Sequence, residues 1–268
     1  MQVKKYENCF SLGCNCWAAA SLAKLGLRSF SGPFDWYWSD FDSVISQIDN
    51  EFADFMKKEN LEIDDSNPKV FWDKKYNFYC IHDIKEDFES EYTEIYDKYI
   101  RRAERFMESI KKPTCFFRAI RSEDEIEYII NNEKYIERVL KKYNSKNSIV
   151  YILLSNMKPL PDHFRWFRLS IDQYIGNAYE MRNMFCQSGE LLRFCENLLS
   201  LEHMKLNKKY DFTKHGQRIV AWEVDHCAQH DIDGVENLIS TAFNLQNREP
   251  FYIFGGGDVR YPLISVSA

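Results

Sequence analysis

The stretch Ser-Ile-Val-Tyr-Ile-Leu-Leu, residues 148–154, decides the fold. After its first residue it runs without a polar break or a charge. An unbroken apolar run of this length is typical of a β-strand that is buried on both faces, as the strands of a parallel sheet are. The run therefore predicts a sheet with helices packed on either side.

The segments on the N-terminal side of this strand follow the same rhythm. Residues 114–120 (TCFFRAI) predict a second strand, and Ser122 with Glu125 forms a capping box that predicts a helix to about residue 143. Before that strand, residues 86–112 carry a helical apolar stripe, and Pro113 ends it. Strand and helix thus alternate, which favours a parallel sheet.

We predict a layered α/β fold with a mainly parallel sheet flanked by helices, and a papain-like α+β fold as the alternative. The alternation of expected strands and helices becomes less regular after about residue 205. We therefore divide the chain into an α/β core at residues 1–205 and an extension at 206–268 that completes the sheet or caps it. Further expected strands lie at 9–12, 76–81, 164–170 and 217–224, a loop at 64–68, and helices at 40–58 and 177–200.

The composition excludes several classes of protein. The chain has 268 residues, a formal charge of −6, and 20 Phe, 16 Tyr and 6 Trp, which predicts an aromatic core. The negative charge argues against a nucleic-acid binder held by a basic surface. No stretch approaches the roughly 20 apolar residues of a membrane span. Eight cysteines without regular disulfide spacing indicate reduced thiols and a cytoplasmic location.

The tract Ser11 to Ala18 (SLGCNCWA) is the strongest functional signal in the chain. Asn15 is a good helix N-cap, so Cys16 falls in the first helical turn, and Gly26 is a natural stop. A helix N-terminus favours the thiolate, which is the nucleophilic form of cysteine. The alternative is that Cys16 is a small buried packing residue.

A nucleophilic thiol needs a base and a group that orients the base. We assign the base to His82, which follows the expected strand 76–81 and would lie at the carboxyl edge of the sheet. Asp35 lies between aromatic residues in Phe30 to Trp36 (FSGPFDW), so we expect a buried carboxylate with an imidazole partner. The alternatives are a surface histidine and an aspartate that bonds only its own turn.

Charged and polar residues near the expected strand ends are candidates for substrate binding. We assign Arg118, Arg121 and Asn15 to this role; Arg118, inside an apolar strand, is an anion ligand or a buried ion-pair partner. His226 and His230 have a metal-binding spacing, but no third ligand is evident and we predict no metal. We likewise predict no cofactor.

The tract SLGCNCWAAASLAKLGLRSFSGPFDWYWSDFDSV, residues 11–44, resembles a bacterial domain family described as "putative papain-like cysteine peptidases". The resemblance continues at His82-Asp83 and at 98–120, and covers about residues 8–155. It implies Cys16 as the nucleophile, with Asp35 and His82 as its partners. Papain-like enzymes carry a glutamine shortly before the cysteine, which this chain lacks. The resemblance therefore supports a nucleophilic cysteine more than protein cleavage.

Three functions remain open at this stage. The first is a thiol-dependent hydrolase or acyltransferase acting on a small-molecule, glycan-linked or peptide substrate. The second is a transferase acting on surface glycans or nucleotide sugars, and the third is a non-catalytic binding module. For the first, we expect the strands that end near Leu12, Ile81 and Ile120 to finish on one edge of the sheet around a shared cleft.

Overall fold

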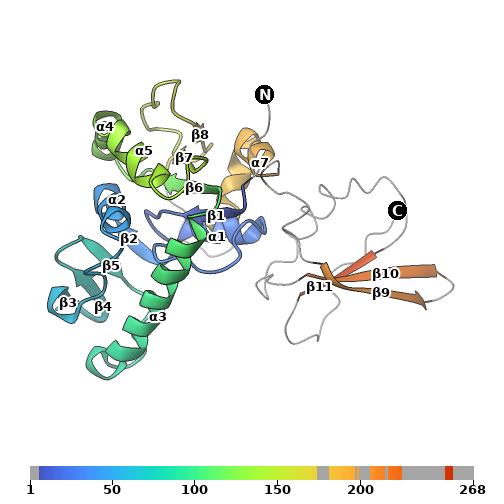
Figure 1. Ribbon diagram of the computed structural model, residues 1–268, viewed down its shortest axis with the longest axis horizontal. Coiled ribbons are helices and arrows are strands. Elements are labelled where there is room, and N and C mark those ends of the chain that lie inside the picture. The colour runs from blue at the N-terminus through green and yellow to red at the C-terminus, as the bar shows by residue number, and fades with distance from the viewer. Residues whose placement is uncertain are drawn as a thin grey trace.

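The computed structural model describes residues 6–173, 181–196 and 198, and the backbone of three later strands. Its centre is a four-stranded sheet in the order β1-β6-β7-β8, in which every neighbouring pair is parallel (Figure 1). The strand read from residues 148–154 lies inside this sheet, as predicted. The strands are β1 (Asn8–Ser11), β6 (Thr114–Ala119), β7 (Ser148–Leu153) and β8 (Trp166–Arg168).

Both faces of this sheet are covered, which explains its apolar strands. Phe116 of β6 packs with α2 (Phe41–Asp49), α3 (Phe88–Ser109) and α5 (Glu133–Lys141). Phe117, the next residue, packs on the other face with α1 (Cys16–Lys24), η2 (Met184–Gln187) and α7 (Gly189–Glu196). Successive side chains of a strand point to opposite faces, so each strand feeds two cores. The layered α/β fold is confirmed.

A second, antiparallel sheet is inserted between α1 and β6. Its order is β2-β5-β4-β3, with β2 (Tyr37–Ser39), β3 (Leu61–Asp64), β4 (Asn67–Asp73) and β5 (Phe78–Cys80). The short η1 (Lys58–Asn60) leads into β3, and the sheet packs on α3, where Tyr37 stacks on Tyr99 with ring centroids 4.8 Å apart. The mixture of the two sheets fits an α/β description and a papain-like α+β description alike.

This insertion corrects two expectations. The loop expected at 64–68 is the turn of a hairpin, since β3 and β4 pair directly across it. The strand expected at 76–81 is β5, which belongs to the antiparallel sheet and not to the central one. β3 and β4 were not among the expected strands. They pair with each other through a short turn and, together with β5 and β2, form a separate sheet.

The helices follow their capping signals. Ser122 accepts a hydrogen bond from the Glu125 backbone N–H at 3.3 Å and starts α4 (Glu123–Asn131). The helix expected to reach residue 143 is divided at Asn132 into α4 and α5. The helix expected at 40–58 ends at Asp49, because Glu51, Phe52 and Met56 have positive φ, which an α-helix does not accommodate.

The expected strand at 217–224 is confirmed as β10 (Gln217–Val224). It pairs antiparallel with β9 (Leu206–Lys214) and parallel with β11 (Phe251–Gly255). The division at residue 205 and the capping role of the extension stay predictions. His226, Cys227 and His230 lie outside the described residues, so their metal-binding spacing is not tested. Within the described part, no helix combines the length and apolarity of a membrane span.

Candidate functional site

The loop between β1 and α1 positions Cys16. The Asn15 side chain accepts a hydrogen bond from the Trp17 N–H at 3.1 Å, so the predicted N-cap is confirmed. Two backbone bonds tie the loop to its neighbours: Ala119 donates to the Gly13 carbonyl at 3.1 Å, and Ser39 to the Cys14 carbonyl at 2.9 Å. Cys16 is thereby held as the first residue of α1, at the carboxyl edge of the parallel sheet.

The environment of the Cys16 thiol does not activate it. The thiol is half-buried and donates a hydrogen bond to the Met181 sulfur at 3.5 Å. Burial raises the pKa of Cys16, although a backbone N–H at the helix start lowers it in part. We expected the helix start to lower this pKa, and the loss of hydration outweighs it. In this arrangement the thiol is protonated at neutral pH.

The other described cysteines separate into packing residues and one surface thiol. Cys186 is exposed. Cys9 is buried, and burial raises its pKa to about 12, as expected of an inert thiol. Cys16 and Cys186 are therefore the two described thiols that solvent reaches. The buried ones are Cys9, Cys14, Cys80, Cys115 and Cys195.

Asp35 is fully buried, as the surrounding aromatic residues predicted. One carboxylate oxygen accepts hydrogen bonds from Arg28 Nη1 at 2.7 Å and from the Gly32 N–H at 2.9 Å. Burial raises the pKa of Asp35, with Arg28 and Gly32 opposing the shift. Its partner is therefore a guanidinium and its own turn, and not an imidazole.

His82 occupies a different place from the one expected. It is exposed, and its ring lies edge-on to Trp36 with centroids 6.0 Å apart. Because it follows β5 of the antiparallel sheet, the expected convergence of three strand ends on one edge is wrong for the strand near Ile81. Of the two histidines in the described part of the chain, neither His82 nor His163 is hydrogen-bonded to Cys16.

The segment that contains Arg28 and Asp35 nevertheless lies close to His82, and Trp36 contacts both. The Arg28 guanidinium lies 5.7 Å from the centre of the Trp36 ring, and Arg28 also holds Asp35. The structure thus brings Asp35 and His82 into one neighbourhood through Trp36, with no direct bond between them among the described contacts.

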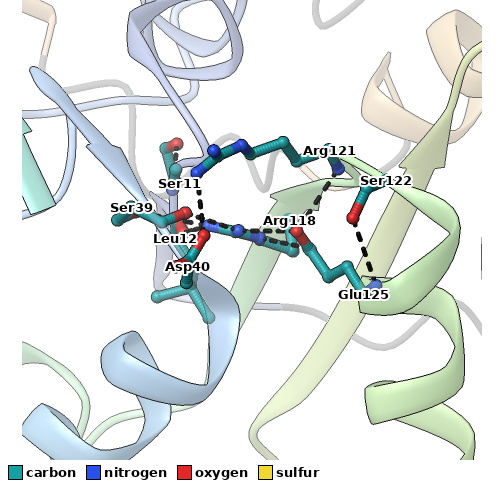
Figure 2. A network of polar contacts seen from close by, with 9 residues as sticks. Ser11, Leu12, Ser39, Asp40, Arg118, Arg121, Ser122 and Glu125 are labelled. Carbon is teal, nitrogen blue, oxygen red and sulfur yellow. Dashed lines mark hydrogen bonds and ion pairs between the residues drawn. The ribbon is translucent and has the colours of Figure 1, made fainter. Parts of the chain in front are cut away.

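Arg118 is a buried ion-pair partner, which was one of the two alternatives (Figure 2). Its Nε and Nη2 groups bond the Glu125 carboxylate at 2.7 and 2.9 Å. The remaining N–H groups reach the Leu12 carbonyl at 2.6 Å and Ser39 through its carbonyl and hydroxyl. Every N–H of the guanidinium is used within the protein in this arrangement, and the assignment of Arg118 to substrate binding stays a prediction.

The two other residues assigned to substrate binding have different surroundings. Arg121 lies at the surface, where it bonds Asp40 at 2.7 Å and lies 6.0 Å from the centre of the Trp38 ring. Asn15 is buried and its side-chain oxygen caps α1. Arg121 is therefore open to solvent and the Asn15 side chain is not, and the assignment of both to substrate binding stays a prediction.

Sequence reasoning missed Arg28 and Met181. Arg28 lies seven residues before Asp35, and a cation so close to a carboxylate expected to be buried is a usable signal. Met181 lies 165 residues from Cys16, and no local pattern links the two. The contact depends on the folding of the whole central sheet.

These features define an α/β domain with a cysteine at the start of the helix that follows the first strand. Residues 7–156 match the family described as "Putative papain-like cysteine peptidase (DUF1796)", and the chain belongs to this family. It is also 30% identical over 183 residues to "Uncharacterized protein R408" of Acanthamoeba polyphaga mimivirus, an alignment that covers 58% of this chain and 80% of that protein. No solved structure matches the chain.

Asp35→Ala should lower the free energy of unfolding by about 1–3 kcal/mol, since it leaves the Arg28 guanidinium and the Gly32 N–H without their acceptor. Urea denaturation measures the loss. Asp97→Ala, which removes an exposed carboxylate from α3, is the control and should change little. Equal losses in the two variants would contradict a scaffolding role for Asp35.

Proposed function

We propose that this chain is a thiol-dependent hydrolase or acyltransferase with Cys16 as its nucleophile. The observation that carries the proposal is the placement of Cys16, half-exposed, as the first residue of α1 at the carboxyl edge of the parallel sheet. Ligands of open α/β sheets bind at this edge. Membership of the peptidase-like family supports the same residue.

The proposed reaction divides into two steps. The Cys16 sulfur attacks an acyl carbon, its proton passes to a base, and a thioester forms as the leaving group departs with a proton. Water or an acceptor nucleophile then releases the acyl group and restores the thiol. Backbone N–H groups at the start of α1 are the donors best placed for the oxyanion.

We assign the base to His82, which requires the imidazole to leave Trp36 and approach Cys16 when substrate binds. Asp35 then acts on His82 indirectly, since Arg28 is bonded to Asp35 and lies against Trp36. Asp35 is in this proposal a positioning residue. The cytoplasmic location, with reduced thiols, stays a prediction.

One observation favours a second candidate, a non-catalytic binding module. The Cys16 thiol is bonded to Met181 and its pKa is raised by burial, as expected of a thiol that is not used as a nucleophile. The third alternative, a transferase acting on glycans or nucleotide sugars, depended on Arg118 as an anion ligand. The internal contacts of Arg118 weaken that support.

The rate of Cys16 alkylation by iodoacetamide as a function of pH separates the first two candidates. The ordinary pKa of a cysteine thiol is about 8.5. A thiol whose pKa is raised above this value reacts only at more alkaline pH, because the thiolate fraction grows with pH. A thiolate stabilised by a protonated His82 adds a second limb at lower pH, where an unpaired thiol does not react. For a hydrolase we expect this limb once a substrate-like acyl ligand is bound.

The measurement is made in a Cys186→Ser background, because Cys186 is the other accessible thiol in the described part. Cys14→Ser, which removes a buried thiol, should leave the profile unchanged. Loss of the low-pH limb in His82→Ala supports the base assignment. A single step at alkaline pH, with and without ligand, would leave the binding module as the better description.

A further inference from the structure

Three arginines near one turn of the chain each lie over an aromatic ring. The guanidinium carbon of Arg102 is 4.9 Å from the centre of the Tyr99 ring. The guanidinium carbon of Arg105 is 4.8 Å from the centre of the Phe30 ring. With Arg28, which also lies over a ring, these residues form what we call the arginine cluster.

The cluster joins two segments that are packed together. Arg102 and Arg105 are neighbours on one face of α3, since residues three apart on a helix lie side by side. Arg105 contacts Phe30, which lies in the turn between Arg28 and Asp35. Burial raises the pKa of Asp35, and among the charges that oppose this rise Arg102 acts beside Arg28. The turn is therefore packed against the part of α3 that carries the two other arginines.

No carboxylate neutralises Arg102 or Arg105 among the described contacts. Arg102 has no hydrogen bond there, and Arg105 donates only to the backbone carbonyl of Arg101, at 3.3 Å. Arg28 differs, since it is paired with Asp35 at 2.7 Å. Three arginines less one aspartate leave two positive charges at this place, in a chain whose net charge is −6.

Arg102 also has a donor that the described part of the chain does not use. Its Nη1 is buried and has no acceptor there. A buried donor of a charged group that lacks an acceptor costs more than about 1 kcal/mol. The side chain as a whole is only half-buried, so solvent reaches part of it. These observations indicate an acceptor from outside the chain, and an anion would neutralise the charge as well as accept the bond.

The way in which the guanidinium groups are held favours a phosphate. An aromatic ring fixes a guanidinium in place without cancelling its charge, and leaves the N–H groups at its edge for oxygen acceptors. A carboxylate brings a single negative charge. A phosphate monoester brings about −1.5 to −2 at neutral pH and three acceptor oxygens. Its charge matches the two that the cluster leaves uncompensated.

The surroundings of the cluster on α3 favour a small ligand. Exposed carboxylates stand beside Arg105 along the helix, at Glu104 and Glu108, and would repel a long polyanion such as a nucleic acid. The large apolar side chains that are exposed in the described part lie on other elements, so this stretch of α3 lacks the groups that insert into a membrane. A single phosphate group avoids both conflicts.

We propose that the arginine cluster binds the phosphate group of a small, soluble phosphorylated ligand. Arg102 and Arg105 supply the uncompensated charge and donate to the phosphate oxygens. The N–H groups of Arg28 that Asp35 does not use are a third set of donors. The site goes beyond the thiol chemistry at Cys16, and it is the same for a hydrolase and for a binding module.

Isothermal titration of the full chain with inorganic phosphate and with phenyl phosphate, at constant ionic strength and about pH 7.5, tests the proposal. We expect a Kd of about 1 mM or lower for phenyl phosphate, and acetate to bind at least about tenfold more weakly. Arg102→Gln and Arg105→Gln should each weaken phosphate binding about tenfold or more. Arg165→Gln is the matched control, because Arg165 is also exposed and lies over a ring, that of Phe194 on α7 at 5.3 Å. It removes the same charge and should leave binding unchanged.

Arg105 is exposed, so Arg105→Gln tests the site even if Arg102→Gln does not fold, and thermal unfolding without ligand checks both variants. Absence of phosphate binding, or binding that survives in both variants, would overturn the proposal. An equal loss in Arg165→Gln would do the same, because it would show a response to net charge alone. Binding that requires vesicles containing phosphatidic acid, or single-stranded RNA, would also overturn it, since the ligand would then be a membrane or a polymer.

Discussion

Replacing Arg118 with methionine should lower the free energy of unfolding by about 3–5 kcal/mol, which urea denaturation measures. The guanidinium is fully buried and joins the end of β1, the end of β2 and the start of α4 through Leu12, Ser39 and Glu125 (Figure 2). Methionine fills the space but leaves the Glu125 carboxylate buried without a cation. It also removes the donors of two backbone carbonyls.

Arg121→Met is the matched control, three residues along the chain. Arg121 has a side chain 40% exposed and pairs with Asp40 at the surface, so its loss should cost no more than about 1 kcal/mol. Arg118→Met combined with Glu125→Met removes both charges and should recover part of the stability. Losses of equal size for Arg118→Met and Arg121→Met would contradict the buried ion pair as the centre of this network.

The central sheet could be predicted because its strands carry the signal locally. Residues 148–154 and 114–120 are apolar on both faces, and the structure covers both faces with helices. The same holds for α1, whose start at Cys16 follows from Asn15 as N-cap. In each case the signal and the structure that it predicts lie within a few residues of each other.

The antiparallel insertion could not be predicted in the same way. Its turn at 64–68 has the composition of any loop, and β3 is only four residues long with two acidic side chains. What makes these segments strands is their pairing, with β5 between β4 and β2. Pairing partners are separated along the chain, and strand preference depends on such neighbours more than helix preference does.

In the candidate site, too, the features that depend on neighbouring residues could be predicted, and those that depend on distant residues could not. The burial of Asp35 followed from the aromatic residues beside it, whereas its bond to Arg28 depends on the turn after α1 folding back. The raised pKa of Cys16 reflects burial, and Met181, which lies against the thiol, is 165 residues away along the chain. A helix start is visible in the sequence, but the desolvation that opposes it is not.

Gly13→Ala should lower the free energy of unfolding by about 2–4 kcal/mol, the second large effect expected. Gly13 has a φ of +83°, which L-residues rarely adopt. A Cβ there would lie 2.6 Å from the Ser39 hydroxyl and 2.9 Å from Arg118 Nη1, closer than packed atoms approach. Arg118 is pinned by Glu125, so it has no room to retreat without losing bonds.

Gly26→Ala separates the two causes of this loss. Gly26 also has a positive φ, +65°, at the end of α1, but lies away from the Arg118 network, so alanine there should cost only the backbone strain of about 1–2 kcal/mol. Ser39→Ala removes the atom nearest to the added Cβ, and combined with Gly13→Ala it should show a coupling energy in a double-mutant cycle. If Gly13→Ala costs no more than Gly26→Ala and is not coupled to Ser39→Ala, then the loop before Cys16 is not held by the contacts described, and the fixed position of the thiol loses its physical explanation.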